Sequence, residues 1–178
     1  MPYTMLEAVS LVLDEMKNTA AGVKPEQVEE LVEAALLAQA VFVAGEGRSG
    51  LIARCLGMRF MQLGLEAHVV GETVTPAFSA DDVLIVFSGS GETAVAGTIA
   101  RAAKEQGGKV AVVTAAAGSS LANLADVTVT IPVGRSVQFG GSLFEQTALV
   151  VCDSLTLILQ QRLGQSEVDI ESRHATLE

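Results

Sequence analysis

Five short apolar segments that alternate with helical patterns constrain the fold of this chain more than any other feature. The segment Val83–Phe87 is an unbroken apolar run, which is typical of a strand buried on both faces of a parallel sheet. Strands that alternate with helices favour parallel pairing and right-handed crossovers. The sequence therefore predicts an α/β fold, a doubly wound five-stranded parallel sheet flanked by helices, with strands at 41–44, 67–70, 83–87, 110–114 and 127–131.

The length of 178 residues suits one domain with a substantial core, and we expect a single domain over residues 1–178. Two leading helices are expected within residues 1–39, the α/β core within 40–163 and a polar C-terminal tail within 164–178. The tail has few apolar residues, so by itself it would fray. Helices are predicted at Met5–Asn18, Pro25–Gln39, Arg48–Leu63, Glu92–Gln106, Ser119–Leu124 and Ser142–Leu163.

The last predicted helix is apolar around much of its circumference, although a helix that covers one sheet face needs only an apolar stripe. This excess favours burial against another subunit, and burial inside the domain is the alternative. Its longest nearly apolar run, Thr147–Leu159, is interrupted by Asp153 and is shorter than the ~20 residues that span a bilayer. We therefore expect no membrane segment.

The formal net charge of −10 repels nucleic acid and anionic membranes at long range. A bound phosphate must therefore be held locally by backbone N–H groups, hydroxyls and one or two cations. The first ten residues lack the basic region of a signal peptide, and Cys55 and Cys152 lie in apolar helical patterns that predict buried, reduced thiols. A cytoplasmic location is expected.

The first loop that carries chemistry is Gly45-Glu-Gly-Arg-Ser-Gly50, between the first strand and its helix. It matches the GxGxxG pattern, and Glu72 lies where a dinucleotide-binding domain has its ribose-binding acid, so an NAD-binding protein is one interpretation. The chain leaves little room for a separate substrate domain, however. Gly47, Arg48 and Ser49 at a helix start also suit a compact terminal phosphate.

The second loop, after the third strand, contains Ser88, Gly89, Ser90, Gly91, Glu92 and Thr93. Its serines and glycines form a nest of N–H and O–H donors at the carboxyl end of a strand. The alternative is a plain tight turn with Ser90 as the N-cap of the next helix. Glu92 would repel a phosphate, so it either faces sugar hydroxyls or caps the helix. Both loops together indicate a polyhydroxyl or phosphate ligand.

Several motifs resemble the sugar isomerase (SIS) domain family and, within it, the 6-phospho-3-hexuloisomerases. They follow one another in the family's order along essentially the whole chain, at 47–50, 71–76, 88–93, 143–146 and 173–178. The resemblance implies a flavodoxin-like SIS fold, a homotetramer, and a metal-independent enzyme without cofactor. Such an enzyme interconverts 3-hexulose 6-phosphate and fructose 6-phosphate in formaldehyde assimilation by the ribulose monophosphate route or in pentose supply.

The resemblance also assigns candidate roles. The substrate contacts fall on Ser49 and on residues 88–93, and the proton acceptor falls on Glu145. Glu145 lies in the first turn of the last helix, where the alternative is an acid that pairs with Ser142 in a capping box. His174, in the polar tail, is a candidate acid or oxyanion donor in its own or a neighbouring subunit, or else a solvated side chain. Arg48 should hold the phosphate or the carbonyl oxygen.

Neither histidine lies in a metal-binding motif, so no metal is expected. A non-catalytic SIS module that senses a sugar phosphate remains the second hypothesis for function. Modules of that kind commonly accompany a DNA-binding domain, and the acidic chain contains none.

Overall fold

The structure is a computed structural model that describes residues 2–177, so Met1 and Glu178, the outer limits of the predicted domain, lie outside it. The strands are β1 (Val41–Gly45), β2 (Ala67–Val69), β3 (Val83–Phe87), β4 (Lys109–Thr114) and β5 (Val127–Thr130). The helices are α1 (Met5–Ala20), α2 (Pro25–Leu37), α3 (Gly47–Gln62), α4 (Ala94–Glu105), α5 (Ser120–Leu124), α6 (Ser142–Leu163) and α7 (Glu167–Ser172).

The five strands form one parallel sheet in the order β2-β1-β3-β4-β5. The strand order therefore reverses between β1 and β3, and Gly45 at the end of β1 lies opposite Phe87 at the end of β3. Ligands of doubly wound sheets bind outside the carboxyl ends of the strands at such a reversal. The predicted fold is confirmed, and its topology puts the two Gly/Ser-rich loops next to each other.

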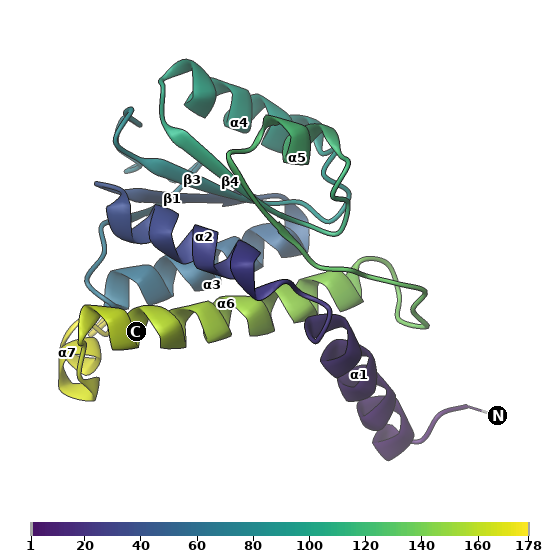
Figure 1. Cartoon of the computed structure of the whole chain (residues 1–178). Coiled ribbons are helices and arrows are strands. Elements are labelled where there is room, and N and C mark those ends of the chain that lie inside the picture. Colours follow the sequence, from purple (N-terminus) through teal and green to yellow (C-terminus); the bar gives the residue numbers. More distant parts are fainter. Residues whose placement is uncertain (1, 178) are drawn as a thin grey trace.

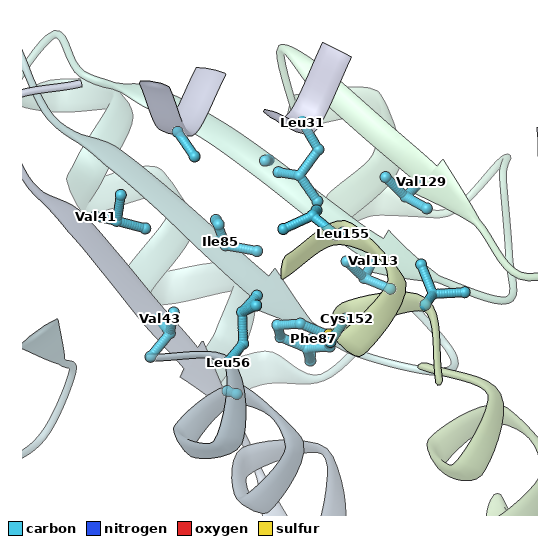
Figure 2. Packing of buried hydrophobic residues seen from close by; sticks show 14 of the residues in the cluster. Leu31, Val41, Val43, Leu56, Ile85, Phe87, Val113, Val129, Cys152 and Leu155 are labelled. Atoms are coloured by element: carbon cyan, nitrogen blue, oxygen red, sulfur yellow. The ribbon is translucent and has the colours of Figure 1, made fainter. Parts of the chain in front are cut away.

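Apolar side chains alternate between the two faces of the sheet, so each face has its own core. Val43, Ile85 and Phe87 lie under α2, α3 and α6, whereas Leu84 and Val86 lie under α4 and α5. Figure 2 shows the first of these cores, in which side chains from α2, α3 and α6 meet those of the central strands. The helix layers on the two faces are visible in Figure 1.

Helix α6 packs on the sheet along one side and leaves apolar side chains exposed on the other. Val150 and Leu157 of α6 are exposed, as is Leu51 on the neighbouring α3. By length and composition α6 could cross a membrane, but half of its most apolar stretch is buried inside the protein, as in a core helix. Most apolar residues of α6 are therefore buried inside the domain, as the alternative expects, and Val150 and Leu157 are those that the single chain leaves exposed.

Helix α1 projects from the N-terminal end of α6 and away from the sheet (Figure 1). It begins with a capping box, in which Thr4 and Glu7 satisfy each other's backbone N–H groups. Met5, Leu6, Val9 and Leu13 are exposed on it, although they are apolar.

The C-terminal tail differs from the prediction, because it forms α7 and docks on its own chain. Ser166 and Asp169 form a capping box that starts this helix. Arg173 Nη1 donates to the carbonyl oxygen of Gln62 at the end of α3 (3.1 Å), and Ile170 packs against the core. The tail is thus ordered by specific contacts despite its polar composition.

The prediction that both cysteines are buried is half wrong. Cys152 on α6 is buried, and this burial raises the pKa of its thiol. Cys55 is exposed on α3, on the same side as Leu51.

Candidate active site

The first loop brings the backbone at the end of β1 into close contact with the first turn of α3. A Cβ atom at Gly50 would lie 2.4 Å from the carbonyl oxygen of Gly45, and Gly47 has a φ of +58°. Both positions therefore require glycine. The N-cap of α3 is Glu46, whose side chain makes no capping hydrogen bond. The first-turn N–H groups of α3 thus point out of the carboxyl edge of the sheet without a side-chain cap.

The second loop is held in shape by its own hydroxyl groups. Ser88 is buried, and its Oγ accepts a hydrogen bond from the Gly91 N–H (3.1 Å) and shares one with Thr93 Oγ1 (2.9 Å). Ser90 is exposed, and its Oγ accepts from the Glu92 N–H (3.2 Å). Ser88 therefore supports the loop from inside, whereas the side chain of Ser90 faces outward.

The interpretation of Ser90 as a helix N-cap is wrong, because α4 begins at Ala94 and its N-cap is Thr93. Thr93 makes no side-chain capping hydrogen bond, since its hydroxyl is shared with Ser88. The second loop consequently ends, like the first, at a helix N-terminus without a side-chain cap. Two such N-termini at adjacent strand ends favour an anionic ligand between them.

Residues after β4 support the second loop, and the sequence analysis did not single them out. Thr114 Oγ1 donates to the carbonyl oxygen of Gly89 (3.3 Å), and the Leu121 N–H donates to that of Gly91 (3.1 Å). Gly91 has a φ of +65° and lies so close to Ser119 that a Cβ atom would be 1.9 Å from Ser119 Oγ. The sequence signal for this support is a polar residue, Thr114, at the carboxyl end of an apolar strand.

Glu92 caps a helix, but the helix is α5 rather than its own α4. Its Oε1 accepts a hydrogen bond from the N–H of Ser120, the first residue of α5 (2.7 Å). This backbone hydrogen bond lowers the pKa of the Glu92 carboxyl below its ordinary value.

Glu145 meets the first loop through Arg48. Arg48 Nε donates to Glu145 Oε2, although the two residues are 97 positions apart. The Glu145 side chain is 13% exposed and that of Arg48 is 61% exposed. The carboxylate is thus enclosed while much of the guanidinium faces solvent.

The residue before Glu145 meets the second loop. A Cβ atom at Gly89 would lie 3.1 Å from the ring of Phe144, so the loop rests on this ring. The N-cap of α6 is Gly141, and Ser142 Oγ donates to the carbonyl oxygen of Phe139. The alternative in which Glu145 pairs with Ser142 in a capping box is therefore wrong. The start of α6 thus meets both loops at the reversal of strand order, Glu145 through Arg48 and Phe144 through Gly89.

His174 is far from this group within the same chain. It follows Arg173, which bonds to Gln62 at the C-terminal end of α3, whereas Arg48 lies at the N-terminal end. Fourteen residues of helix correspond to about 21 Å. Figure 1 likewise shows α7 beside the C-terminal end of α6, opposite the end that carries Glu145. Any role of His174 in catalysis therefore requires a second copy of the chain.

Other candidate groups are engaged elsewhere. Glu72, the acid of the NAD interpretation, accepts a hydrogen bond from Arg54 on α3 (2.8 Å). His68 lies against the ring of Phe42 and pairs with Glu66. Within residues 2–177, no group of three or more His, Cys, Asp or Glu side chains is arranged to hold a metal ion.

The fold and this site define the class of protein. The profile of the SIS domain family matches residues 37–158, from the end of α2 into the last turns of α6. The chain therefore belongs to the SIS domain family.

Relatives within the family make the comparison more specific. The chain is 45% identical over 181 residues to the 3-hexulose-6-phosphate isomerase of Mycobacterium gastri, with 96% of this chain and 89% of that protein covered. It is 37% identical to the protein of the same name from Bacillus subtilis, with 97% and 98% covered. The resemblance to the 6-phospho-3-hexuloisomerases is confirmed.

A solved structure agrees with these relatives. The crystal structure of a hypothetical protein from Methanococcus jannaschii superposes with a TM-score of 0.88 at 32% identity, covering 97% of this chain and 99% of that one. For that protein, a molecular function of 3-hexulose-6-phosphate isomerase is inferred from its structure.

Proposed function

We propose that this protein is an isomerase that interconverts 3-hexulose 6-phosphate and fructose 6-phosphate. The observation that carries the proposal is that the start of α6 meets both Gly/Ser-rich loops, through Glu145 on Arg48 and through Phe144 on Gly89, and each loop ends at a helix N-terminus without a side-chain cap. Relatives named 3-hexulose-6-phosphate isomerase at 37–45% identity over nearly the whole chain support the choice of substrate.

The reaction moves a carbonyl group between C3 and C2 of the sugar and needs one base. The base removes the C2 proton of the 3-hexulose, the electrons form an enediol(ate) across C2 and C3, and a proton returns to C3. We assign the base to Glu145, whose enclosed carboxylate pairs with Arg48 of the first loop. The negative charge that develops on oxygen needs a nearby donor, and Arg48 is the nearest cation.

The two loops hold the sugar phosphate in this proposal. Ser49 and the first-turn N–H groups of α3 serve one side, and the segment 88–93 with the start of α4 serves the other. The outward hydroxyl of Ser90 is the most accessible in the second loop, and Ser88 preserves the loop's shape. Because Arg48 uses Nε for Glu145 and remains 61% exposed, its terminal nitrogens can reach the ligand.

We further propose that the site is completed by a neighbouring subunit, and that the assembly is a homotetramer. The exposed apolar residues of α1, α3 and α6 are the surfaces for this association. Such an assembly would let α7 carry His174 to the loops of another copy, as acid or oxyanion donor. In the single chain the same residue follows Arg173, which bonds to the end of α3 that lies about 21 Å along the helix from Arg48.

The proposal treats residues 1–178 as one SIS domain that acts in the cytoplasm without metal or cofactor. The acidic composition and the predicted reduced state of the thiols support this location. Formaldehyde assimilation by the ribulose monophosphate route, or pentose supply, is the corresponding metabolic role.

A coupled assay tests the proposal, with 3-hexulose 6-phosphate as substrate. The fructose 6-phosphate formed is converted by added glucose-6-phosphate isomerase to glucose 6-phosphate, which is then oxidised by glucose-6-phosphate dehydrogenase with NADP. The wild-type protein should turn over without added metal. Glu145→Gln should lower kcat at least ~10²-fold with nearly unchanged substrate binding. Asp153→Asn, an exposed acid on the same helix, is the matched control. Ligand binding without turnover by the wild type would favour the sugar-phosphate-sensing alternative.

A further inference from the structure

The start of α6, which carries Glu145, lacks the usual stabilisation of a helix end. Its N-cap is Gly141, which has no side chain to accept a hydrogen bond from the first turn. Gly140 precedes it with a φ of +59°. Two consecutive glycines make a permissive joint, so the position of the first turn must be fixed by other contacts.

Arg48 and Gly89 contact this turn from the two loops, and Glu15 of α1, more than 120 positions away in the sequence, holds the segment that leads into it. The Glu15 carboxylate accepts hydrogen bonds from Ser136 Oγ (2.7 Å), the Val137 N–H (3.1 Å) and Gln138 Nε2 (2.9 Å). Ser136 Oγ in turn accepts from the Gln138 N–H (3.0 Å). One side chain of α1 thus holds three consecutive residues of the segment that leads into α6.

The segment 136–138 is connected directly to the first turn of α6. The carbonyl oxygen of Phe139 accepts hydrogen bonds from both the N–H (3.3 Å) and the Oγ (2.7 Å) of Ser142. Three residues later, the Glu145 N–H donates to the carbonyl oxygen of Gly141 (3.1 Å). Glu15 therefore anchors residues 136–138, and the backbone of residues 139–141 joins this anchored segment to the turn that carries the residue that we assign as the base.

Charge favours the same arrangement. The hydrogen bond from the Gln138 side chain, followed by those from Ser136 and Val137, lowers the pKa of the Glu15 carboxyl below its ordinary value. Glu15 is therefore ionised at neutral pH, and hydrogen bonds to an ionised acceptor are stronger than those between neutral groups.

We propose that Glu15 is a positioning residue, which holds Glu145 at the reacting atoms through residues 136–142. This inference rests on the proposed function, because it takes Glu145 as the base. It links the projecting helix α1 to the candidate site, although α1 contributes no group that touches the substrate.

The variant Glu15→Gln keeps the size of the side chain and removes its charge. We expect kcat to fall about tenfold with little change in KM, since a misplacement of about 1 Å costs up to ~10²-fold in rate. Asp14→Asn is the matched control, because Asp14 is the adjacent exposed acid on α1 and makes no side-chain hydrogen bond within residues 2–177. It should keep wild-type kinetics.

A double-mutant cycle separates positioning from a general structural role. If Glu15 acts through Glu145, then Glu15→Gln combined with Glu145→Gln should be no slower than Glu145→Gln alone. A double variant that is slower than Glu145→Gln by the same factor as Glu15→Gln is slower than the wild type would overturn the proposal. An unchanged kcat for Glu15→Gln would also overturn it.

Ser136→Ala offers a second measurement if Glu15→Gln does not fold. It removes one donor of the same cluster from a loop, and kcat should fall about threefold, on the scale of one modest hydrogen bond. If Glu15→Gln does not fold and Ser136→Ala keeps the wild-type kcat, the proposal is overturned. Failure of the proposed function is a distinct result, because the wild-type protein would then show no turnover; a Glu145→Gln protein that retains most of the wild-type kcat would remove only the assignment of the base.

Discussion

Replacing Gly91 by Ala tests how tightly the second loop is built into the fold. Gly91 has a φ of +65°, and a Cβ atom there would lie 1.9 Å from Ser119 Oγ and 2.4 Å from Ser119 Cβ. A left-handed conformation costs Ala roughly 1–2 kcal/mol. Moving Ser119 away adds about 1–3 kcal/mol, the usual cost of overpacking.

The expected loss for Gly91→Ala is therefore about 2–5 kcal/mol in the free energy of unfolding. Gly47→Ala is the matched control, because Gly47 has a φ of +58° but an added Cβ meets nothing within 4 Å. It should lose only the roughly 1–2 kcal/mol of backbone strain. Urea denaturation at one fixed protein concentration measures both losses.

A rescue variant tests the cause of the difference. Ser119→Gly removes both of the overlapping atoms, and glycine as the N-cap of α5 costs only a few tenths of a kcal/mol. Gly91→Ala with Ser119→Gly should therefore recover about 1–3 kcal/mol of the loss. Equal losses for Gly91→Ala and Gly47→Ala, or no recovery in the double variant, would refute the reasoning.

Four further outcomes concern the second loop, the ligand and the assembly. Arg48→Lys keeps the charge but loses the planar fork, so KM for fructose 6-phosphate should rise severalfold in steady-state kinetics. Ser88→Ala should lower the free energy of unfolding by about 1 kcal/mol, because the Thr93 hydroxyl loses its partner while the Gly91 N–H keeps the carbonyl oxygen of residue 88 as acceptor. Ser90→Ala should instead leave stability within about 0.5 kcal/mol and weaken binding in a titration. Mixing inactive Glu145→Gln and His174→Ala subunits should restore activity if sites are shared, and no recovery despite subunit exchange would exclude sharing.

The fold was predictable from the sequence because burial on both faces leaves a clear pattern in parallel strands. Val83–Phe87 is predicted with the same bounds that the structure has, and so is the helix Ser142–Leu163. The start of α4 was less predictable, because Glu92 and Thr93 are good helix-start residues that here make contacts outside the helix. Helix α7 was missed because its stability depends on Arg173 and Ile170 docking on α3 and the core.

The candidate site was predictable only to the level of its loops. Parallel topology brings the ends of β1 and β3 together, so the positions of Arg48 and Ser90 follow from the strand order. The pairing of Arg48 with Glu145 depends on how α6 is rotated and docked, and no local pattern encodes that geometry. The cluster around Glu15 joins three segments of the chain and was invisible for the same reason.

Carbon-13 NMR of fructose 6-phosphate labelled at C2 tests the isomerisation most directly. Incubated with the purified protein and no added metal or cofactor, the label should move from the hemiketal resonance of C2 to that of an alcohol carbon, as the carbonyl moves to C3. The Glu145→Gln protein should make the same change at least ~10²-fold more slowly. A wild-type protein that binds fructose 6-phosphate but leaves the C2 resonance unchanged would contradict the proposed reaction.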